Sequence, residues 1–590
     1  MFQGHSFRSF LVTCLIATVS AQDIRGRIAG RVTDSGGAVI AKAELRATNT
    51  STGIQIPAET NEAGLYELPY LAPGIYSLTA SAPGFKRFER KAIEVRVGER
   101  LQVDAVLEVG DVSESVTVTG EAQLIESSTA SIGQVVDRKR LLELPLPGGN
   151  SLALARLSQG VQNFGAPNHP SLGPAVEVLS SISVNGVRPG NTEFTIDGTP
   201  AMWGTNASVA PPAEMVAEFK VQTATYDAAI GRAPGGNVNL VLRSGTNKFH
   251  GMVYHFHNNQ VLTGMDLFQR QLLASGPLTD ERRAQANPRN ILNRFGTNFS
   301  GPLVLPKLYD GHNKTFWIYG FEGLTRPGIE RGNSFYTVPT LAQRRGDFSG
   351  LLPLGPSYQV YDPATITAAA GGRFSRLPFA GNIIPASRLD QTAQKINPLW
   401  LEPNTTGTTD GRNNYQRLPG SYNEYRSHTA KLDHNFSNNH RAFLRYNRWY
   451  QLFSSGDLLG NGTNGTDRFR RNWGFGADDV YVFSPSFLMN LRWGFARTEQ
   501  TFIPLASNFD LNSLGFSSQL INSIDPAARY LTQIAPAGIQ SVSNAARSST
   551  TANYHTWAAD FTKSLSRHTL RFGAEYRLYR EHTYNFALVT

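Results

Sequence analysis

The sequence predicts a mainly β protein made of several domains in succession. Short alternations of apolar and polar residues, each closed by Gly, Pro, Asn or Asp, recur along the first part of the chain. From about Thr246 onward the alternating segments become longer and follow one another in pairs. The chain has 590 residues, of which 40% are hydrophobic and 10% aromatic, so it can bury a sizeable core in more than one domain.

The N-terminus has the pattern of a secretory signal peptide over residues 1–21. A basic start precedes an apolar run from Phe10 to Val19, and Val19-Ser20-Ala21 supplies small residues for cleavage. The run is shorter than the roughly 20 residues of a spanning helix, and a short buried helix is the alternative interpretation. The only cysteine, Cys14, lies in this run, so the mature chain is expected to form no intrachain disulfide.

The charge pattern and the histidines argue against two classes of protein. The net charge is +9, but basic residues are spread along strands and loops rather than clustered, so no nucleic-acid partner is expected. None of the 12 histidines is followed three residues later by Glu, the spacing that a metallocarboxypeptidase needs. His255 and His257 share one face of a predicted strand without a third ligand nearby. The sequence therefore predicts no catalytic residues, no metal site and no cofactor.

Residues 23–109 are predicted to form a small β-sandwich. Turn sequences such as Ala72-Pro73-Gly74 separate evenly spaced short strands. The predicted strands are 26–32, 43–49, 64–68, 74–80, 87–95 and 100–108. Gly30-Arg31-Val32-Thr33-Asp34 and Leu71-Ala72-Pro73-Gly74-Ile75-Tyr76 are similar to the carboxypeptidase regulatory-like domain, a name that implies no peptidase activity.

A linker at residues 110–120 carries an extended, β-branched segment, Glu114-Ser115-Val116-Thr117-Val118, between Gly110 and Gly120. Such a segment can offer its backbone to the sheet edge of another protein. On its own, a Val-Thr alternation is more often an ordinary strand of a sandwich or linker. Both interpretations remain open for these five residues.

Residues 121–245 show short strands that glycines interrupt, with a helix expected from Asp137 to Leu144 that Pro145 ends. Glycines there provide positive φ and close backbone approach, as a small domain packed against a wall requires. The residues expected to hold its turns and wall contacts, or to take part in gating, are Asn185, Gly186, Arg188, Asp197, Gly198, Gly235, Gly236 and Arg243.

This glycine-punctuated region, above all Ser181 to Gly251, resembles the plug of TonB-dependent outer-membrane transporters. The match includes Glu218-Phe219-Lys220-Val221-Gln222-Thr223 and extends over more than a hundred residues in total. In that family a TonB box precedes the plug, and Glu114 to Val118 stands at the corresponding place. The resemblance therefore favours the partner-binding interpretation of the linker.

Residues 246–590 are predicted to form part of a transmembrane antiparallel β-barrel. In Thr569 to Glu581, apolar residues alternate with Arg, Gly and Glu, and Phe487 to Phe495 shows the same pattern. One face suits lipid and the other a watery lumen, whereas a soluble sandwich or propeller, the alternative, seldom places Arg and Glu so regularly on its inner face. About nine strands can be recognised, an odd number, so the chain is expected to be part of a longer barrel.

A long connection at about 325–426 is rich in Gly, Pro and Asn and too long for a simple turn. Its segments Tyr336-Thr337-Val338-Pro339-Thr340 and Arg345-Gly346-Asp347-Phe348-Ser349-Gly350 resemble the Oar-like group of TonB-dependent transporters. It is expected to lie outside the cell, where it could gate the barrel or capture a ligand.

Together these resemblances imply a receptor or transporter in the bacterial outer membrane, with the N-terminal domain and plug on the periplasmic side. The implied partners are a TonB-type energy-transducing protein, outer-membrane lipid and an unidentified extracellular ligand, such as a carbohydrate, a peptide or a siderophore. The alternative is an outer-membrane surface adhesion or assembly protein of Oar type that carries out no transport.

Overall fold

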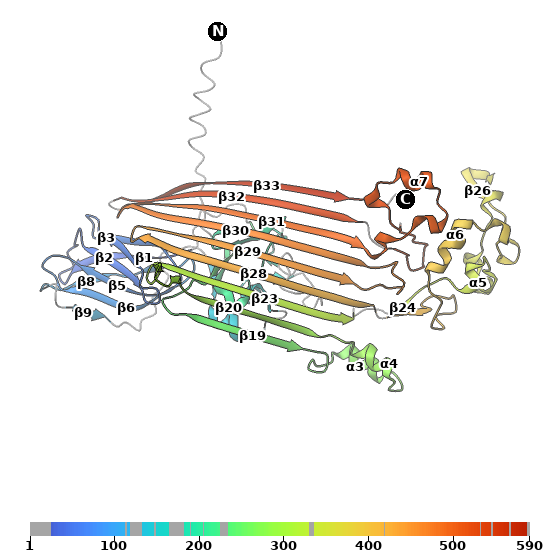
Figure 1. Ribbon diagram of the computed structural model, residues 1–590, viewed down its shortest axis with the longest axis horizontal. Coiled ribbons are helices and arrows are strands. Elements are labelled where there is room, and N and C mark those ends of the chain that lie inside the picture. Colours follow the sequence, from blue (N-terminus) through green and yellow to red (C-terminus); the bar gives the residue numbers. More distant parts are fainter. Residues whose placement is uncertain are drawn as a thin grey trace, which may run out of the picture.

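The computed structural model places a small sandwich at one end of a long sheet and a group of loops at the other (Figure 1). No helix in the described part of the chain is long and apolar enough to cross a membrane. The predicted signal peptide and Glu114 lie outside the described residues. The structure describes residues 25–111, 115–118, 132–144, 146, 149–163, 182–188, 190–204, 206–224, 234–329, 335–417, 419–531, 533–543, 547–565 and 568–586.

The sandwich consists of two sheets that enclose an apolar core, with Ile28, Leu68 and Leu78 fully buried. One sheet has the order β4-β1-β7, with β8 also paired to β1, and the other has the order β3-β2-β5-β6-β9. The strands are β1 (Gly26–Asp34), β2 (Glu44–Asn49), β3 (Gln55–Glu59), β4 (Leu65–Leu71), β5 (Gly74–Ser81), β6 (Arg87–Val95), β7 (Arg100–Gln102), β8 (Ala105–Leu107) and β9 (Ser115–Val118).

Two strand predictions for the sandwich were wrong. The sequence interpretation omitted β3, which contains Pro57; this strand lies at the edge of its sheet, where a missing N–H is tolerated. The single strand expected at 100–108 is divided into β7 and β8, both parallel to β1. Between them the backbone N–H of Val103 donates to the carbonyl of Ala29, so the pairing with β1 continues across the break.

The plug-like domain, the described residues from 132 to 242, is built on a mixed sheet of order β10-β17-β18-β13-β14. Its central strand β18 is buried along its whole length, because other elements cover both faces of the sheet. The helix expected from Asp137 is confirmed as α2 (Arg138–Glu143), and the Asp137 side chain caps it by accepting from the N–H of Arg140. The strands are β10 (Ile132–Val136), β11 (Val161–Asn163), β12 (Ile182–Val184), β13 (Glu193–Ile196), β14 (Thr199–Pro200), β15 (Met202–Trp203), β16 (Asn206–Ala207), β17 (Val216–Ala224) and β18 (Asn237–Leu242).

The long sheet contains nine antiparallel strands in the described residues, each paired with its neighbours in chain order, as expected. On β31, Asn490 and Arg492 are buried while Leu491 between them is 40% exposed. This pattern is the reverse of that in a soluble protein, and it is typical of a barrel wall whose inner face is polar and whose outer face is apolar. The strands are β19 (His250–Asn258), β20 (Leu292–Pro302), β23 (Thr315–Ile329), β28 (Gly420–Ser437), β29 (His440–Ser455), β30 (Thr466–Ser484), β31 (Phe487–Pro504), β32 (Ser548–Ser564) and β33 (Thr569–Asn585).

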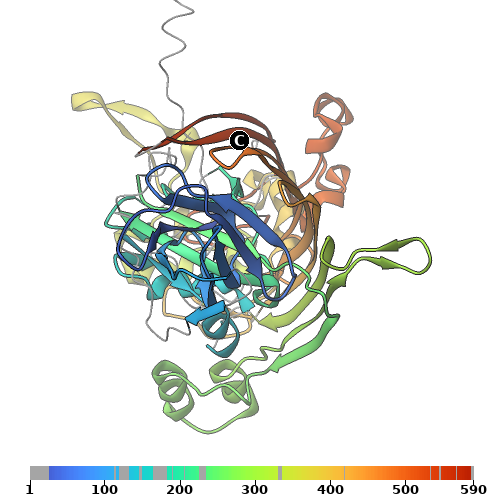
Figure 2. The same cartoon turned by 90° about the vertical axis from the view of Figure 1, so that its left-hand side faces the viewer.

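The sheet is concave, and its inner face curves round the plug-like domain (Figure 2). Short turns join its strands at the end where the sandwich lies, and one of them accepts a hydrogen bond at Leu565 O from the Asn61 side chain, at 3.3 Å. The longest connection joins Ile329, the last residue of β23, to Gly420, the first residue of β28. It is shorter at both ends than the expected loop of about 325–426, because the two strands extend into it.

The long loops at the opposite end share a small hydrophobic core. Trp400 and Tyr415 from the longest loop pack there with Leu459 and Leu531 from two others. These loops contain α5 (Leu341–Arg344), α6 (Gln391–Ile396), α7 (Ser518–Ser523), β24 (Phe335–Tyr336), β25 (Thr367–Ala369), β26 (Arg373–Ser375) and β27 (Tyr415–Gln416). A further loop holds α3 (Leu267–Ala274) and α4 (Asp280–Ala286), and a hairpin near the sandwich holds β21 (Val304–Leu305) and β22 (Tyr309–Asp310).

Candidate functional site

The candidate site is the contact between the plug-like domain and the inner face of the barrel strands. At its centre lies Asp197, at the tip of the β13–β14 hairpin, with only 2% of its surface exposed. Its carboxylate accepts from the N–H of Leu242 at 3.1 Å and from Lys431 Nζ on β28 at 3.2 Å. Arg445 on β29 adds a second cation at 3.8 Å and donates to Thr199. One plug carboxylate therefore ties two barrel strands to the hairpin.

The hairpin tip requires an unusual backbone. Asp197 and Gly198 both have positive φ, at 47° and 78°, as the two central residues of a type I′ turn do. The carbonyl of Gly198 accepts from Arg492 on β31 at 3.3 Å. This turn carries the carboxylate of Asp197 and the carbonyl of Gly198 to the barrel wall together.

Two further buried ion pairs hold the plug-like domain elsewhere. Arg294 on β20 lies 2.7 Å from both Glu214 of the plug and Glu322 of the barrel, and the Tyr254 hydroxyl also donates to Glu322 at 2.9 Å. Arg577 on β33 lies 2.7 Å from Glu193 on β13. Breaking a buried pair leaves an uncompensated charge, at a cost of about 3–5 kcal/mol.

Glycines on the barrel wall bring the two surfaces close together. A Cβ atom at Gly494 on β31 would lie 2.9 Å from the Cβ of Thr199, and one at Gly320 on β23 would lie 2.5 Å from Met215 Sδ. A larger residue at Gly494 would require the β13–β14 hairpin or β31 to shift slightly, and one at Gly320 would displace the Met215 side chain. The inner face is therefore shaped to fit this domain.

The other predicted plug residues lie in turns and at strand ends. Asn185 and Gly186 form a turn with positive φ at both positions, and Arg188 is exposed, with its carbonyl accepting from Asn191. Gly235 and Gly236 precede β18: a Cβ on Gly235 would lie 2.9 Å from Asn191 O, and Gly236 has φ 99°. Arg243 follows β18 and donates to the carbonyl of Glu214 at 3.3 Å.

The predicted partner-binding segment forms a strand of the sandwich. Ser115 to Val118 are β9, which pairs in parallel with Arg87 to Arg90 of β6 at the end of the five-stranded sheet. In this position the segment matches the ordinary-strand interpretation. β9 is the edge strand of this sheet, since no described strand pairs with its other side.

The sandwich also contacts the plug-like domain and the barrel directly. The N–H of Val97 donates to Glu218 on β17, and Lys220 Nζ donates to the carbonyl of Gly98 at 3.2 Å. Arg25 forms an ion pair with Asp478 on β30 at 2.8 Å. Burial raises the pKa of Glu218 to about 7, although the hydrogen bond from Val97 opposes that shift.

Sequence reasoning missed most of the plug's charged contacts. It placed the arginines of Phe487 to Phe495 and of Thr569 to Glu581 on the inner faces of strands, but it did not identify their partners or the roles of Lys431 and Glu214. The regular Arg and Glu positions on those faces were the available signal. His255 and His257 have ring centroids 6.5 Å apart, and the described residues contain no group of three potential metal ligands.

Comparison with protein-family models identifies the class of protein that this architecture represents. Residues 241–588 match the family described as Outer membrane beta barrel domain, and residues 27–108 match the one described as Carboxypeptidase regulatory-like domain. The molecule is therefore an outer-membrane barrel protein with an N-terminal carboxypeptidase regulatory-like domain. Since the first match spans more than half of the chain, the chain belongs to the outer membrane β-barrel domain family.

A curated relative confirms the resemblance to Oar-like proteins. The chain is 29% identical over 281 residues to the TonB-dependent transporter Oar of Myxococcus xanthus, covering 45% of this chain and 24% of that protein. The match thus spans about a quarter of the relative's length.

Two solved structures of outer-membrane proteins are also similar. The outer membrane transporter YddB from Escherichia coli has 10% identity and a TM-score of 0.47, over 76% of this chain and 48% of that one. A mutant of the ferric enterobactin receptor PfeA from Pseudomonas aeruginosa has 12% identity and a TM-score of 0.39, over 75% and 48%.

The short turns and long loops fix the orientation of the protein in the membrane. In bacterial outer-membrane barrels the turns are periplasmic and the long loops extracellular. Because the sandwich contacts the turns, it lies on the periplasmic side, and the loops with the shared core lie outside the cell.

Replacing Asp197 with Asn should loosen the plug-like domain, because Lys431 and Arg445 would lose their shared carboxylate. We expect a loss of about 3–5 kcal/mol in the free energy of plug unfolding, measured by urea titration of a fluorophore on the domain. Asp197→Asn with Lys431→Met should recover part of this loss. Asp362→Asn, which breaks an exposed loop pair with Arg388, is the control and should leave plug unfolding unchanged. Equal effects of Asp197→Asn and the control would contradict the assignment.

The contact between the sandwich and the plug-like domain should weaken as the pH rises. The pKa of Glu218 is raised to about 7, so the docked state retains a proton that the undocked state releases near the ordinary carboxyl value. The stabilisation that Glu218 gives to the docked state is therefore complete below the ordinary pKa of a glutamate side chain, and it is lost as the pH approaches about 7. Hydrogen exchange of the Val97 amide, corrected for intrinsic rates, should accelerate over that range. Glu218→Gln should abolish the dependence, whereas Glu59→Gln, on the exposed sandwich surface, should preserve it.

Proposed function

We propose that the chain is part of a TonB-dependent outer-membrane transporter, in which the plug-like domain closes the barrel until it is pulled. The observation that carries the proposal is the buried set of ion pairs around Asp197, Arg294 and Arg577, which holds this domain against the barrel wall. A domain fixed in this way blocks the lumen at rest. A path opens only when part of it is displaced.

The chain order suggests how a pull would reach the plug. The candidate TonB box, Glu114 to Val118, precedes β10, and β10 is the outermost strand of the plug sheet, paired on one side only with β17. Within the plug-like domain, tension on the box would therefore act on β10 first. An edge strand can detach one hydrogen bond after another, which needs less force than moving the whole domain at once.

The extracellular loops are the proposed place of ligand capture. Three of these loops form one unit, because Trp400, Leu459 and Leu531, one from each, share a core. The cargo class follows only from resemblance and comprises carbohydrates, peptides and siderophores. The relative from Myxococcus xanthus, which carries the name of a TonB-dependent transporter, supports transport as the activity.

The competing proposal is a surface adhesion or assembly protein that uses the barrel as a membrane anchor. The packed loop unit favours it, since a rigid extracellular surface suits contact with another cell or macromolecule. The two proposals differ in whether Glu114 to Val118 are needed. A strain lacking only these five residues should fail to grow on the nutrient that the protein imports, while adhesion would survive the deletion.

A proline at position 116 tests the partner-binding strand more finely. Strand addition relies on backbone hydrogen bonds, so Val116→Pro should reduce the disulfide cross-link between Ser115→Cys and a cysteine in the TonB partner strand by about tenfold. Val116→Ile keeps the N–H and is the matched control, with an unchanged cross-link yield expected. Full cross-linking of the proline variant would contradict recognition through the main chain.

A further inference from the structure

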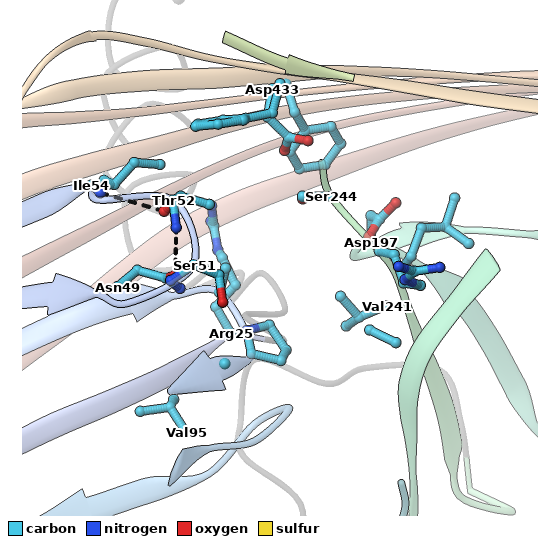
Figure 3. Close-up of a pocket in the computed structure, with 18 of the residues that line it drawn as sticks. Arg25, Asn49, Ser51, Thr52, Ile54, Val95, Asp197, Val241, Ser244 and Asp433 are labelled. Carbon is cyan, nitrogen blue, oxygen red and sulfur yellow. Dashed lines mark hydrogen bonds between the residues drawn. The ribbon is translucent and has the colours of Figure 1, made fainter. Parts of the chain in front are cut away.

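A cavity of about 630 Å³ lies where the sandwich, the plug-like domain and the barrel meet. Figure 3 shows it between the sandwich loop from Asn49 to Ile54 and the plug residues Asp197 and Val241, with Asp433 of the barrel along another side. The cavity is on the periplasmic side of the plug, away from the extracellular loops. It is therefore separate from the proposed place of ligand capture.

Two arginines of the plug-like domain line this cavity. Arg138 is the first residue of α2, and Arg243 follows the last residue of β18. Both donate through Nη1 to the carbonyl of Glu214, at 3.4 Å and 3.3 Å, and Arg138 also donates to the carbonyl of Val216 at 3.3 Å. The two guanidinium groups thus converge on one peptide oxygen. Each has five N–H donors, and these contacts use only one nitrogen of each group.

Among the residues that the structure describes, no carboxylate forms an ion pair with Arg138 or Arg243. The nearby carboxylate of Glu214 lies 2.7 Å from Arg294 instead. Among the other acids that line the cavity, Asp197 pairs with Lys431, Asp478 with Arg25 and Glu94 with Arg96, and Glu218 accepts from the N–H of Val97. Arg138 and Arg243 therefore face the cavity without an ion pair of their own, and the carboxylate of Glu214, which acts on Arg138 electrostatically, is already bound to Arg294.

The surroundings make these charges costly. Burial and the neighbouring Arg243 lower the pKa of Arg138 to about 10, although Glu214 opposes that shift, and burial lowers the pKa of Arg243 as well. Such shifts mean that the protein environment disfavours the two positive charges relative to water. An anion in the cavity would remove this penalty.

We propose that Arg138 and Arg243 form a binding site for one carboxylate or phosphate group at the junction of the three domains. Planar guanidinium groups bind both oxyanions through paired hydrogen bonds. Lys139 lines the same cavity and adds positive charge at its edge. A bound anion would link α2 to the end of β18 and so stiffen the plug surface that the sandwich covers. The source is a free phosphate or an organic acid of the periplasm.

The test is isothermal titration of the detergent-purified protein with inorganic phosphate and, separately, with succinate at constant ionic strength. We expect at least one probe to bind with one-to-one stoichiometry. Arg138→Gln with Arg243→Gln should weaken that binding about tenfold to a hundredfold, because two charge-assisted contacts are lost. Binding of phosphate alone would assign the site to phosphate, and binding of succinate alone to a carboxylate.

The matched control is Arg373→Gln with Arg376→Gln, which removes two charges from an exposed extracellular loop and should leave binding unchanged. Arg138→Lys with Arg243→Lys keeps both charges. It provides a second test of the site in case the glutamine variant does not fold. It should bind more weakly than the natural protein, because lysine lacks the planar fork. The proposal is overturned if neither probe binds, or if binding survives unchanged in the folded glutamine or lysine variant.

Discussion

Buried ion pairs between the plug-like domain and the barrel wall are the interaction on which the rest of the structure depends. The inner faces of the strands carry Lys431, Arg294 and Arg577, and the plug supplies Asp197, Glu214 and Glu193 opposite them. Removing Asp197 or Arg294 would leave buried charges without their partners, so the domain has one preferred position. The same polar groups can be rehydrated if water enters, whereas an apolar interface would oppose separation at every step. A contact of this kind is firm at rest and can still be opened.

The sequence predicts the architecture well because lipid inverts the usual burial pattern. Leu491 alternates with buried polar residues on β31, and Phe572 alternates with the half-buried Arg571 and Gly573 on β33; that alternation alone identifies the barrel strands. The plug contacts could not be predicted in the same way, because they join residues far apart in the chain, as Glu193 and Arg577 are. Local signals also failed at β3, where Pro57 obscured an edge strand, and they left the position of β9 undecided. The shared core of the extracellular loops depends likewise on long-range packing.

The sandwich adds a second layer beneath the plug. It touches the plug through Glu218 and the barrel through Asp478, and it holds Ser115 to Val118 of the candidate TonB box as β9 at the edge of its own sheet. Tension on that strand would therefore act on the sandwich as well as on β10. The charged cavity between the three domains lies where such a movement would begin. Under the proposed function and the proposed anion site, periplasmic pH and small anions would affect the resting state from the side opposite to the extracellular loops.

Single-molecule pulling from position 116 tests most directly whether the plug-like domain is the moving part. Cysteines at Thr199 and Gly494 would tether the β13–β14 hairpin to β31, since their Cβ atoms would lie 2.9 Å apart, about 1 Å closer than in a typical disulfide. The account predicts that the plug extends while the barrel strands stay folded. Under oxidising conditions extension should stop at position 199, and with reductant it should continue beyond it. Barrel strands that unravel before the plug, or an extension that the tether leaves unchanged, would contradict the account.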